Sequence, residues 1–111
     1  MKKTTYDLTQ VQMISDNDPD FVNTMVDTFL KEMPLDLENL ASAVLEENRE
    51  NVRLYAHKMK PSLELFGLKG HERARNLELW GKNTEQKDIN EDFMFLHQEL
   101  ENTFLELERD F

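Results

Sequence analysis

The stretch VRLYAHKMKPSLELFG, residues 52–67, has the apolar spacing of a helix with a proline inside it. Its apolar positions recur every three or four residues, at Val52, Tyr55, Ala56, Met59, Leu63 and Phe66. Pro61 has no N–H to donate, and its ring crowds the carbonyl four residues earlier, which is that of His57. Because Leu63 and Phe66 keep the register of Met59, we expect one continuous helix. The alternative is a helix that ends near Met59 and a second one that begins at Pro61.

A helical wheel of this stretch places His57 away from the apolar face. With about 100° per residue, His57 falls about 140° from Val52, and Lys60 at i+3 is its neighbour on the helix surface. Leu54 and Leu65 fall about 200–220° from Val52, on the side expected to face solvent. The wheel therefore predicts an exposed imidazole next to an ammonium group, with apolar side chains around them.

Helical periodicity continues on both sides of this stretch, and we find no alternating strand pattern of useful length. Capping residues, prolines and glycines predict where the helices start. The expected helices begin near Thr9, Pro19, Pro34, Asn48, Gly70 and Ile89. Residues 81–88 are polar and are expected to form a loop. Since each helix has one apolar stripe to bury, residues 1–111 are expected to form one all-α domain, an antiparallel up-and-down four-helix bundle with a short extra N-terminal helix.

The composition excludes several classes of function. The formal charge of −10 argues against a nucleic-acid partner, and there is no cysteine for a disulfide or a thiolate metal site. No histidine follows a glutamate by three positions, as a di-iron bundle requires, and no GxGxxG or GKS/GKT motif is present for a nucleotide. No apolar run approaches the roughly 20 residues of a membrane span, so no membrane partner and a cytoplasmic setting are expected.

Basic residues are concentrated around His57. Residues 49–75 contain seven Lys and Arg against three Glu, although the whole chain has 13 Lys and Arg against 23 Asp and Glu. Charged helix surfaces are common in bundles, so this region can be an ordinary solvated face. A local basic region in an acidic protein can also bind an anion.

The segment YAHKMKPSLELFGLKG, residues 55–70, resembles the signature of histidine phosphotransfer (HPt) domains. That signature is Ala-His-x-x-Lys-Gly-small, with a glycine ten residues after the histidine. The matching residues are Ala56, His57, Lys60, Ser62 and Gly67. Residues 6–30 also resemble the opening of the family, and the expected helix order agrees over nearly the whole chain. Pro61 departs from the family pattern, which usually has glycine there.

The resemblance implies a phosphocarrier of a multistep phosphorelay in two-component signalling. His57 would accept a phosphoryl group from the aspartate of a receiver domain and pass it to another receiver, and Lys60 would offset the phosphoryl charge. The implied partners are receiver domains of hybrid histidine kinases and of response regulators. The receiver would supply Mg²⁺, so this chain would need no metal or other cofactor and would have no kinase activity of its own.

A receiver is expected to dock on a monomer, over the helix that carries His57. The expected docking residues are Arg53, Leu54, Lys58, Pro61, Glu64 and Leu65. Two other functions stay open. Pro61 and Glu64 are consistent with an HPt-like scaffold that binds a receiver without being phosphorylated, and an apolar strip at Leu54 and Leu65 is consistent with a helical oligomerisation module. Both a stand-alone protein and a domain of a hybrid kinase fit this sequence.

Overall fold

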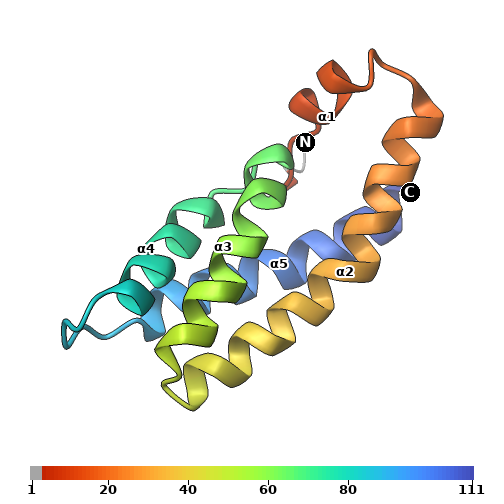
Figure 1. The fold of residues 1–111 in the computed structure, drawn as a ribbon. Helices are drawn as coiled ribbons and strands as arrows, with labels where there is room; N and C mark the ends of the chain where they lie inside the picture. Colours follow the sequence, from red (N-terminus) through yellow and green to blue (C-terminus); the bar gives the residue numbers. More distant parts are fainter. Residues whose placement is uncertain (1–3) are drawn as a thin grey trace.

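The computed structural model describes residues 4–111, and these form five helices arranged as a bundle (Figure 1). The helices are α1 (Thr9–Ile14), α2 (Pro19–Leu45), α3 (Arg49–Leu65), α4 (Gly70–Lys82) and α5 (Asn90–Asp110). Helices α2 to α5 run alternately in opposite directions. Each packs against the next, α5 also contacts α2, and the short α1 lies at one end against α2. The predicted all-α four-helix bundle with a short extra N-terminal helix is confirmed.

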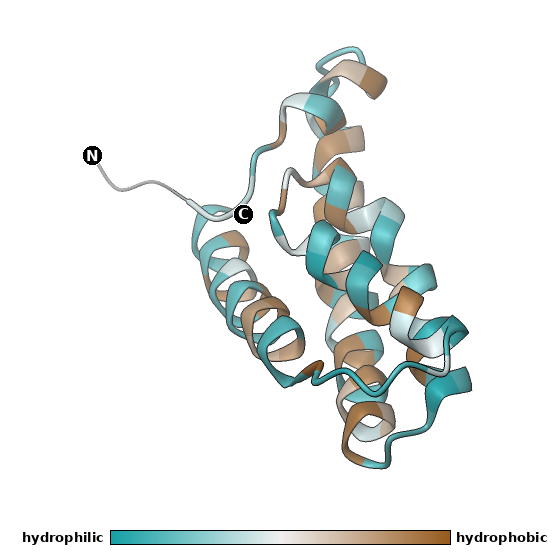
Figure 2. Cartoon of the chain, turned by 90° about the vertical axis from the view of Figure 1, so that its left-hand side faces the viewer, coloured by the Kyte–Doolittle hydropathy of each residue, from teal (hydrophilic) through white to brown (hydrophobic). Residues whose placement is uncertain are grey.

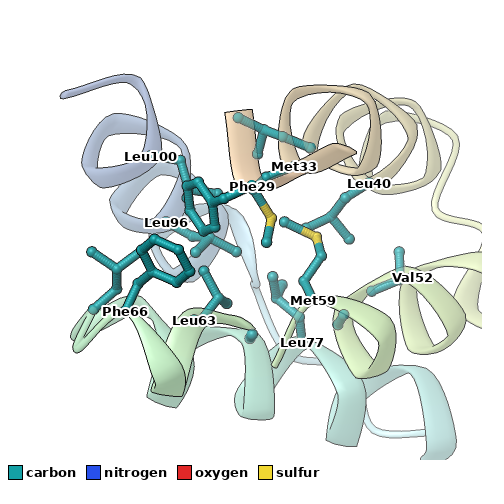
Figure 3. Close-up of a cluster of buried hydrophobic side chains, with 14 of the residues drawn as sticks. Phe29, Met33, Leu40, Val52, Met59, Leu63, Phe66, Leu77, Leu96 and Leu100 are labelled. Carbon is teal, nitrogen blue, oxygen red and sulfur yellow. The ribbon is translucent and has the colours of Figure 1, made fainter. Parts of the chain in front are cut away.

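The core lies between the four long helices, and its side chains point toward one another (Figure 3). The fully buried members include Leu40, Met59, Leu63, Phe66, Leu77, Leu96 and Leu100. Phe29 of α2 stacks on Phe66 at the end of α3, with ring centroids 4.3 Å apart. Hydrophobic and hydrophilic residues alternate along each helix (Figure 2), as expected when one face packs inward. Burial of each large apolar side chain stabilises the fold by about 1.5–3 kcal/mol.

Helix α3 continues through Pro61, so the prediction of one helix is confirmed. Its N-cap is Asn48, whose side chain accepts a hydrogen bond from the Asn51 N–H. Leu63 beyond the proline is as fully buried as Met59 before it. Burial on both sides of Pro61 offsets the cost of a proline in a helix interior, which is about 3 kcal/mol.

The predicted helix start at Pro34 is wrong, because α2 is one helix of 27 residues with that proline inside it. Asp18 caps this helix by accepting a hydrogen bond from the Asp20 N–H. Met33 and Leu37 lie on either side of Pro34, and both are buried in the same core. The apolar stripe crosses the proline without a change of register, so tertiary packing outweighs its local preference to begin a helix.

The loop after α4 begins later than the predicted residue 81, because Gly81 and Lys82 belong to the helix. Gly81 lies directly against the first turn of α3. A Cβ atom on Gly81 would be 2.6 Å from the carbonyl oxygen of Arg49 and 2.9 Å from the backbone nitrogen of Arg53. Only a glycine therefore permits this close approach of the two helices.

Arg49 fixes the end of α4 to the start of α3. Its guanidinium donates to the backbone carbonyls of Trp80, Asn83 and Glu85 at 2.6–2.8 Å. It also lies 4.1 Å from the centre of the Trp80 ring, which is a cation–π contact. These contacts satisfy carbonyls at and beyond the helix end and hold the last turn of α4 beside α3. No helix in the described part of the chain is long and apolar enough to span a membrane.

We expect Gly81→Ala to destabilise the protein by about 1–3 kcal/mol, since the added methyl meets backbone atoms of α3. At an exposed helix position the same change stabilises by up to about 1 kcal/mol, so the sign of the effect is diagnostic. Urea unfolding followed by circular dichroism measures it. Arg75→Ala, at an exposed position of the same helix, is the control and should change the free energy of unfolding by less than about 0.5 kcal/mol. A Gly81→Ala protein as stable as the wild type would contradict the close contact.

Candidate functional site

His57 lies on the outer side of α3, and its side chain is 70% exposed, as the wheel predicts. Its Nδ1 atom lies 2.8 Å from Oε2 of Glu78 on the neighbouring helix α4. An ionised carboxylate can only accept hydrogen bonds, so Nδ1 of the imidazole must donate. In a neutral ring the lone pair then lies on Nε2. The contact with Glu78 thus sets both the orientation and the tautomer of an exposed histidine.

Glu78 is the most buried charged group of this site, with only 6% of its side chain exposed. Besides His57, it faces two ammonium groups. Lys60 Nζ lies 2.6 Å from Oε1, and Lys82 Nζ lies 3.4 Å from Oε2. Burial alone raises the pKa of this carboxyl, but the hydrogen bonds and positive charges around it outweigh that effect and lower the pKa to about 2. Glu78 is therefore ionised at any physiological pH.

Lys60 is next to His57, as its position at i+3 predicts. Its ammonium group forms an ion pair with Glu78 and does not extend unpaired into solvent. Its side chain is only 28% exposed. Glu78 therefore joins the histidine and the lysine of the sequence motif through one carboxylate. With a neutral imidazole, the cluster of His57, Lys60, Glu78 and Lys82 carries one net positive charge, because two ammonium groups face one carboxylate. An anion that approaches the ring meets this excess charge.

Sequence reasoning missed Glu78 and Lys82, which come from a different helix. One signal for Glu78 was present. It lies among Ala74, Leu77 and Gly81, at the spacing of the face of α4 that packs inward. An acidic side chain at such a position needs a charged or hydrogen-bonding partner. The sequence does not show which residue of another helix supplies that partner.

Four of the predicted docking residues lie on the accessible surface of α3. Leu54, Pro61 and Glu64 are exposed, and Arg53 is half-buried where Gly81 contacts it. Leu54 is 51% exposed, which is a large fraction for a leucine. These four residues and the ring of His57 belong to the same helix.

The other two predicted docking residues turn toward α2. The Lys58 ammonium lies 2.9 Å from the buried carboxylate of Asp36 on α2, and this pairing raises the pKa of Lys58. The expectation that Leu65 faces solvent is wrong, since it is half-buried against the core. It lines a groove with Met25 and Phe29. The N-terminal half of α2 covers this side of α3, which a wheel of α3 alone does not show.

The other two histidines lie outside this cluster. Nδ1 of His71 is 3.9 Å from a carboxylate oxygen of Glu64, and Nε2 of His97 is 3.6 Å from one of Glu101. No group of three or more His, Asp or Glu side chains within residues 4–111 is arranged to hold a metal ion.

The family model of the Hpt domain matches residues 24–108. This match covers most of the chain, from α2 to the last turns of α5, and includes His57 and its neighbours. The chain therefore belongs to the Hpt domain family. Hpt domains are phosphocarriers rather than kinases, and they interact with receiver domains in phosphorelay signalling. Searches of curated proteins and of solved structures gave no match.

The pKa of Glu78 gives a prediction for the stability of the fold. Since its folded-state pKa of about 2 lies below the value of 4.5 expected when unfolded, the ionised carboxylate stabilises the fold above about pH 4.5. This stabilisation is lost as the pH falls toward and through 2. Glu78→Gln should lower the free energy of unfolding at pH 7 by about 1–3 kcal/mol, and the difference from the wild type should shrink between pH 4.5 and pH 2.

Urea unfolding over this pH range measures the difference. Glu64→Gln is the matched control, because Glu64 is exposed and is also near a histidine. This control should change the free energy of unfolding by less than about 0.5 kcal/mol at pH 7. A difference between Glu78→Gln and wild type that stayed constant from pH 7 to pH 2 would show that the charge of Glu78 does not stabilise the fold.

Proposed function

We propose that this protein is a histidine phosphotransfer protein of a multistep phosphorelay. In this role His57 accepts a phosphoryl group from the aspartate of one receiver domain and passes it to a second receiver. The observation that carries the proposal is the hydrogen bond between Nδ1 of His57 and Glu78, in a chain of the Hpt family. This hydrogen bond leaves the lone pair of an exposed imidazole on Nε2, so that Nε2 can act as the nucleophile toward a phosphoryl group.

The chemical step requires an accessible lone pair and a way to compensate charge. The Nε2 lone pair attacks the phosphorus of the aspartyl phosphate, the N–P bond forms, and the O–P bond breaks. The aspartate leaves with the electron pair as a carboxylate. The proton on Nδ1 stays in place, so the ring acquires a positive charge during the transfer. Glu78, with its carboxylate oxygen 2.8 Å from Nδ1, stabilises that charge as it develops.

Lys60 acts on the other partner of the reaction, the phosphoryl group. Phosphoryl transfer depends mainly on alignment and on electrostatic stabilisation of the transferred group. The Lys60 ammonium is held by Glu78 on the same side of α3 as His57, from where it can donate to a phosphoryl oxygen. In this proposal Mg²⁺ belongs to the receiver, and this chain supplies the histidine, the carboxylate and the cations.

The receiver would dock over the outer face of α3. Leu54 and Pro61 offer exposed apolar surface next to the histidine, while Arg53 and Glu64 are charged residues at the edge. Lys58 contributes less to such a surface than the sequence suggested, because its charge is compensated by Asp36 of α2. The proposed setting is the cytoplasm, where receiver domains of response regulators act.

A transfer assay tests the proposal. A receiver domain phosphorylated with labelled phosphate on its aspartate is mixed with this protein, and we expect label to move to it. The label should be stable in alkali and lost in acid, as a phosphohistidine is, and it should be absent from His57→Gln. The control is His97→Gln, which removes a half-buried histidine of α5 outside the site and should take label like the wild type.

Two results would contradict the phosphocarrier. Label on His57→Gln would place the acceptor elsewhere. If the wild type takes label from none of the receivers of the host, phosphoryl transfer is excluded. If a receiver then still binds the wild type and His57→Ala equally well, the protein is better described as a scaffold.

A further inference from the structure

Lys82 lies in the site, although it is outside the sequence motif. It is the last residue of α4, one turn after Glu78, and its Nζ lies 3.4 Å from Oε2 of that carboxylate. The same oxygen lies 2.8 Å from Nδ1 of His57. Lys82 reaches this place because Gly81 allows the end of α4 to touch α3. The distance to Glu78 is longer than that of Lys60, and 53% of the Lys82 side chain is exposed.

The net charge of the cluster after phosphorylation of His57 is zero only when both lysines are counted. Before transfer, the two ammonium groups and the Glu78 carboxylate leave one positive charge beside a neutral ring. The transfer step adds a dianionic phosphoryl group and places one positive charge on the ring. With both lysines the phosphorylated cluster is neutral, whereas with Lys60 alone it would carry one negative charge. A surplus negative charge next to the buried Glu78 carboxylate is unfavourable, and the ammonium group of Lys82 cancels it.

Of the two lysines, Lys82 is the one that can leave the Glu78 carboxylate with little loss of stability. In the ion pair between Lys82 and Glu78 the ammonium group is about half exposed and lies 3.4 Å from the carboxylate, so breaking this contact costs the fold little stability. A charge-assisted hydrogen bond to a phosphoryl oxygen is stronger than this contact. Lys60 is more buried and makes a contact of 2.6 Å, so it has less freedom to leave the carboxylate.

We infer that Lys82 is a second phosphoryl-binding cation, which Glu78 holds beside His57 until the phosphoryl group arrives. On phosphorylation Lys82 turns from the carboxylate to a phosphoryl oxygen, and Glu78 keeps its hydrogen bond to Nδ1. This inference rests on the proposed function. It assigns to α4, outside the His-x-x-Lys segment of α3, a share in how strongly the protein retains its phosphoryl group.

The test compares Lys82→Gln with a control of equal charge change. Lys87→Gln removes one positive charge from the loop after α4, at an exposed residue that makes no ion pair among the described residues. The measured quantity is the equilibrium constant for sharing phosphate between a receiver and this protein at low salt. We expect Lys82→Gln to shift it toward the receiver by about three- to tenfold relative to Lys87→Gln. Lys82→Arg should restore most of the difference, and higher salt should reduce it.

A second measurement avoids the receiver. Phosphoramidate phosphorylates the histidine directly: the Nε2 atom bonds to phosphorus, the P–N bond of the reagent breaks, and ammonia leaves. Phosphorus NMR then follows the half-life of the phosphohistidine, which should be shorter in Lys82→Gln than in Lys87→Gln. Thermal unfolding of the unphosphorylated proteins should be the same for both variants, which separates phosphoryl binding from a purely structural role.

The outcomes separate this inference from the proposed function. If the wild type takes phosphate from neither a receiver nor phosphoramidate, the proposed function is overturned together with the role of Lys82. If the wild type is phosphorylated and Lys82→Gln matches Lys87→Gln in both measurements, only the role of Lys82 is overturned. A loss in Lys82→Gln that Lys82→Arg does not restore would also overturn it, because the charge would then not be the cause.

Discussion

One buried carboxylate on α4 organises the surface of α3. Glu78 contacts the imidazole of His57 and the ammonium groups of Lys60 and Lys82, and nothing else in the cluster is as buried. The geometry depends on how near α4 lies to α3, which is set by Gly81 and by the contacts of Arg49 around the end of α4. The side chains of the proposed site and the contacts that set the helix spacing therefore lie on the same helix pair, α3 and α4. The rest of the bundle acts mainly as the support that keeps these two antiparallel helices close together.

Both long proline-containing helices show that packing can outweigh a local signal. Pro34 and Pro61 each remove one backbone hydrogen bond, yet buried residues continue on both sides of each proline. An ion pair between Asp36 and Lys58 joins the two stretches, two residues after one proline and three residues before the other. The two helices are therefore held together where each has lost part of its own hydrogen bonding.

The sequence predicted the features that depend on one helix at a time. The register of α3 predicted its continuity through Pro61, the exposure of His57 and the position of Lys60. The same register argument applies at Pro34, where giving priority to the proline led to the wrong boundary. Leu65 was misplaced because a wheel shows only the angle of a residue and not how far the next helix extends over it. Glu78 and Lys82 were missed because 23 acidic and 13 basic residues offer many pairings, and only the packing of α4 on α3 selects among them.

The uneven charge of the chain has a consequence for how a partner approaches. A body with a formal charge of −10 repels an acidic protein at long range over most of its surface, whereas the region around His57 attracts it. Encounters with a partner whose binding face is negatively charged are therefore oriented before contact, so fewer collisions occur at the other faces of this protein. Salt screens this attraction beyond a Debye length of about 8 Å at physiological ionic strength. The association rate constant should therefore depend on ionic strength more strongly than the dissociation rate constant of the final complex does.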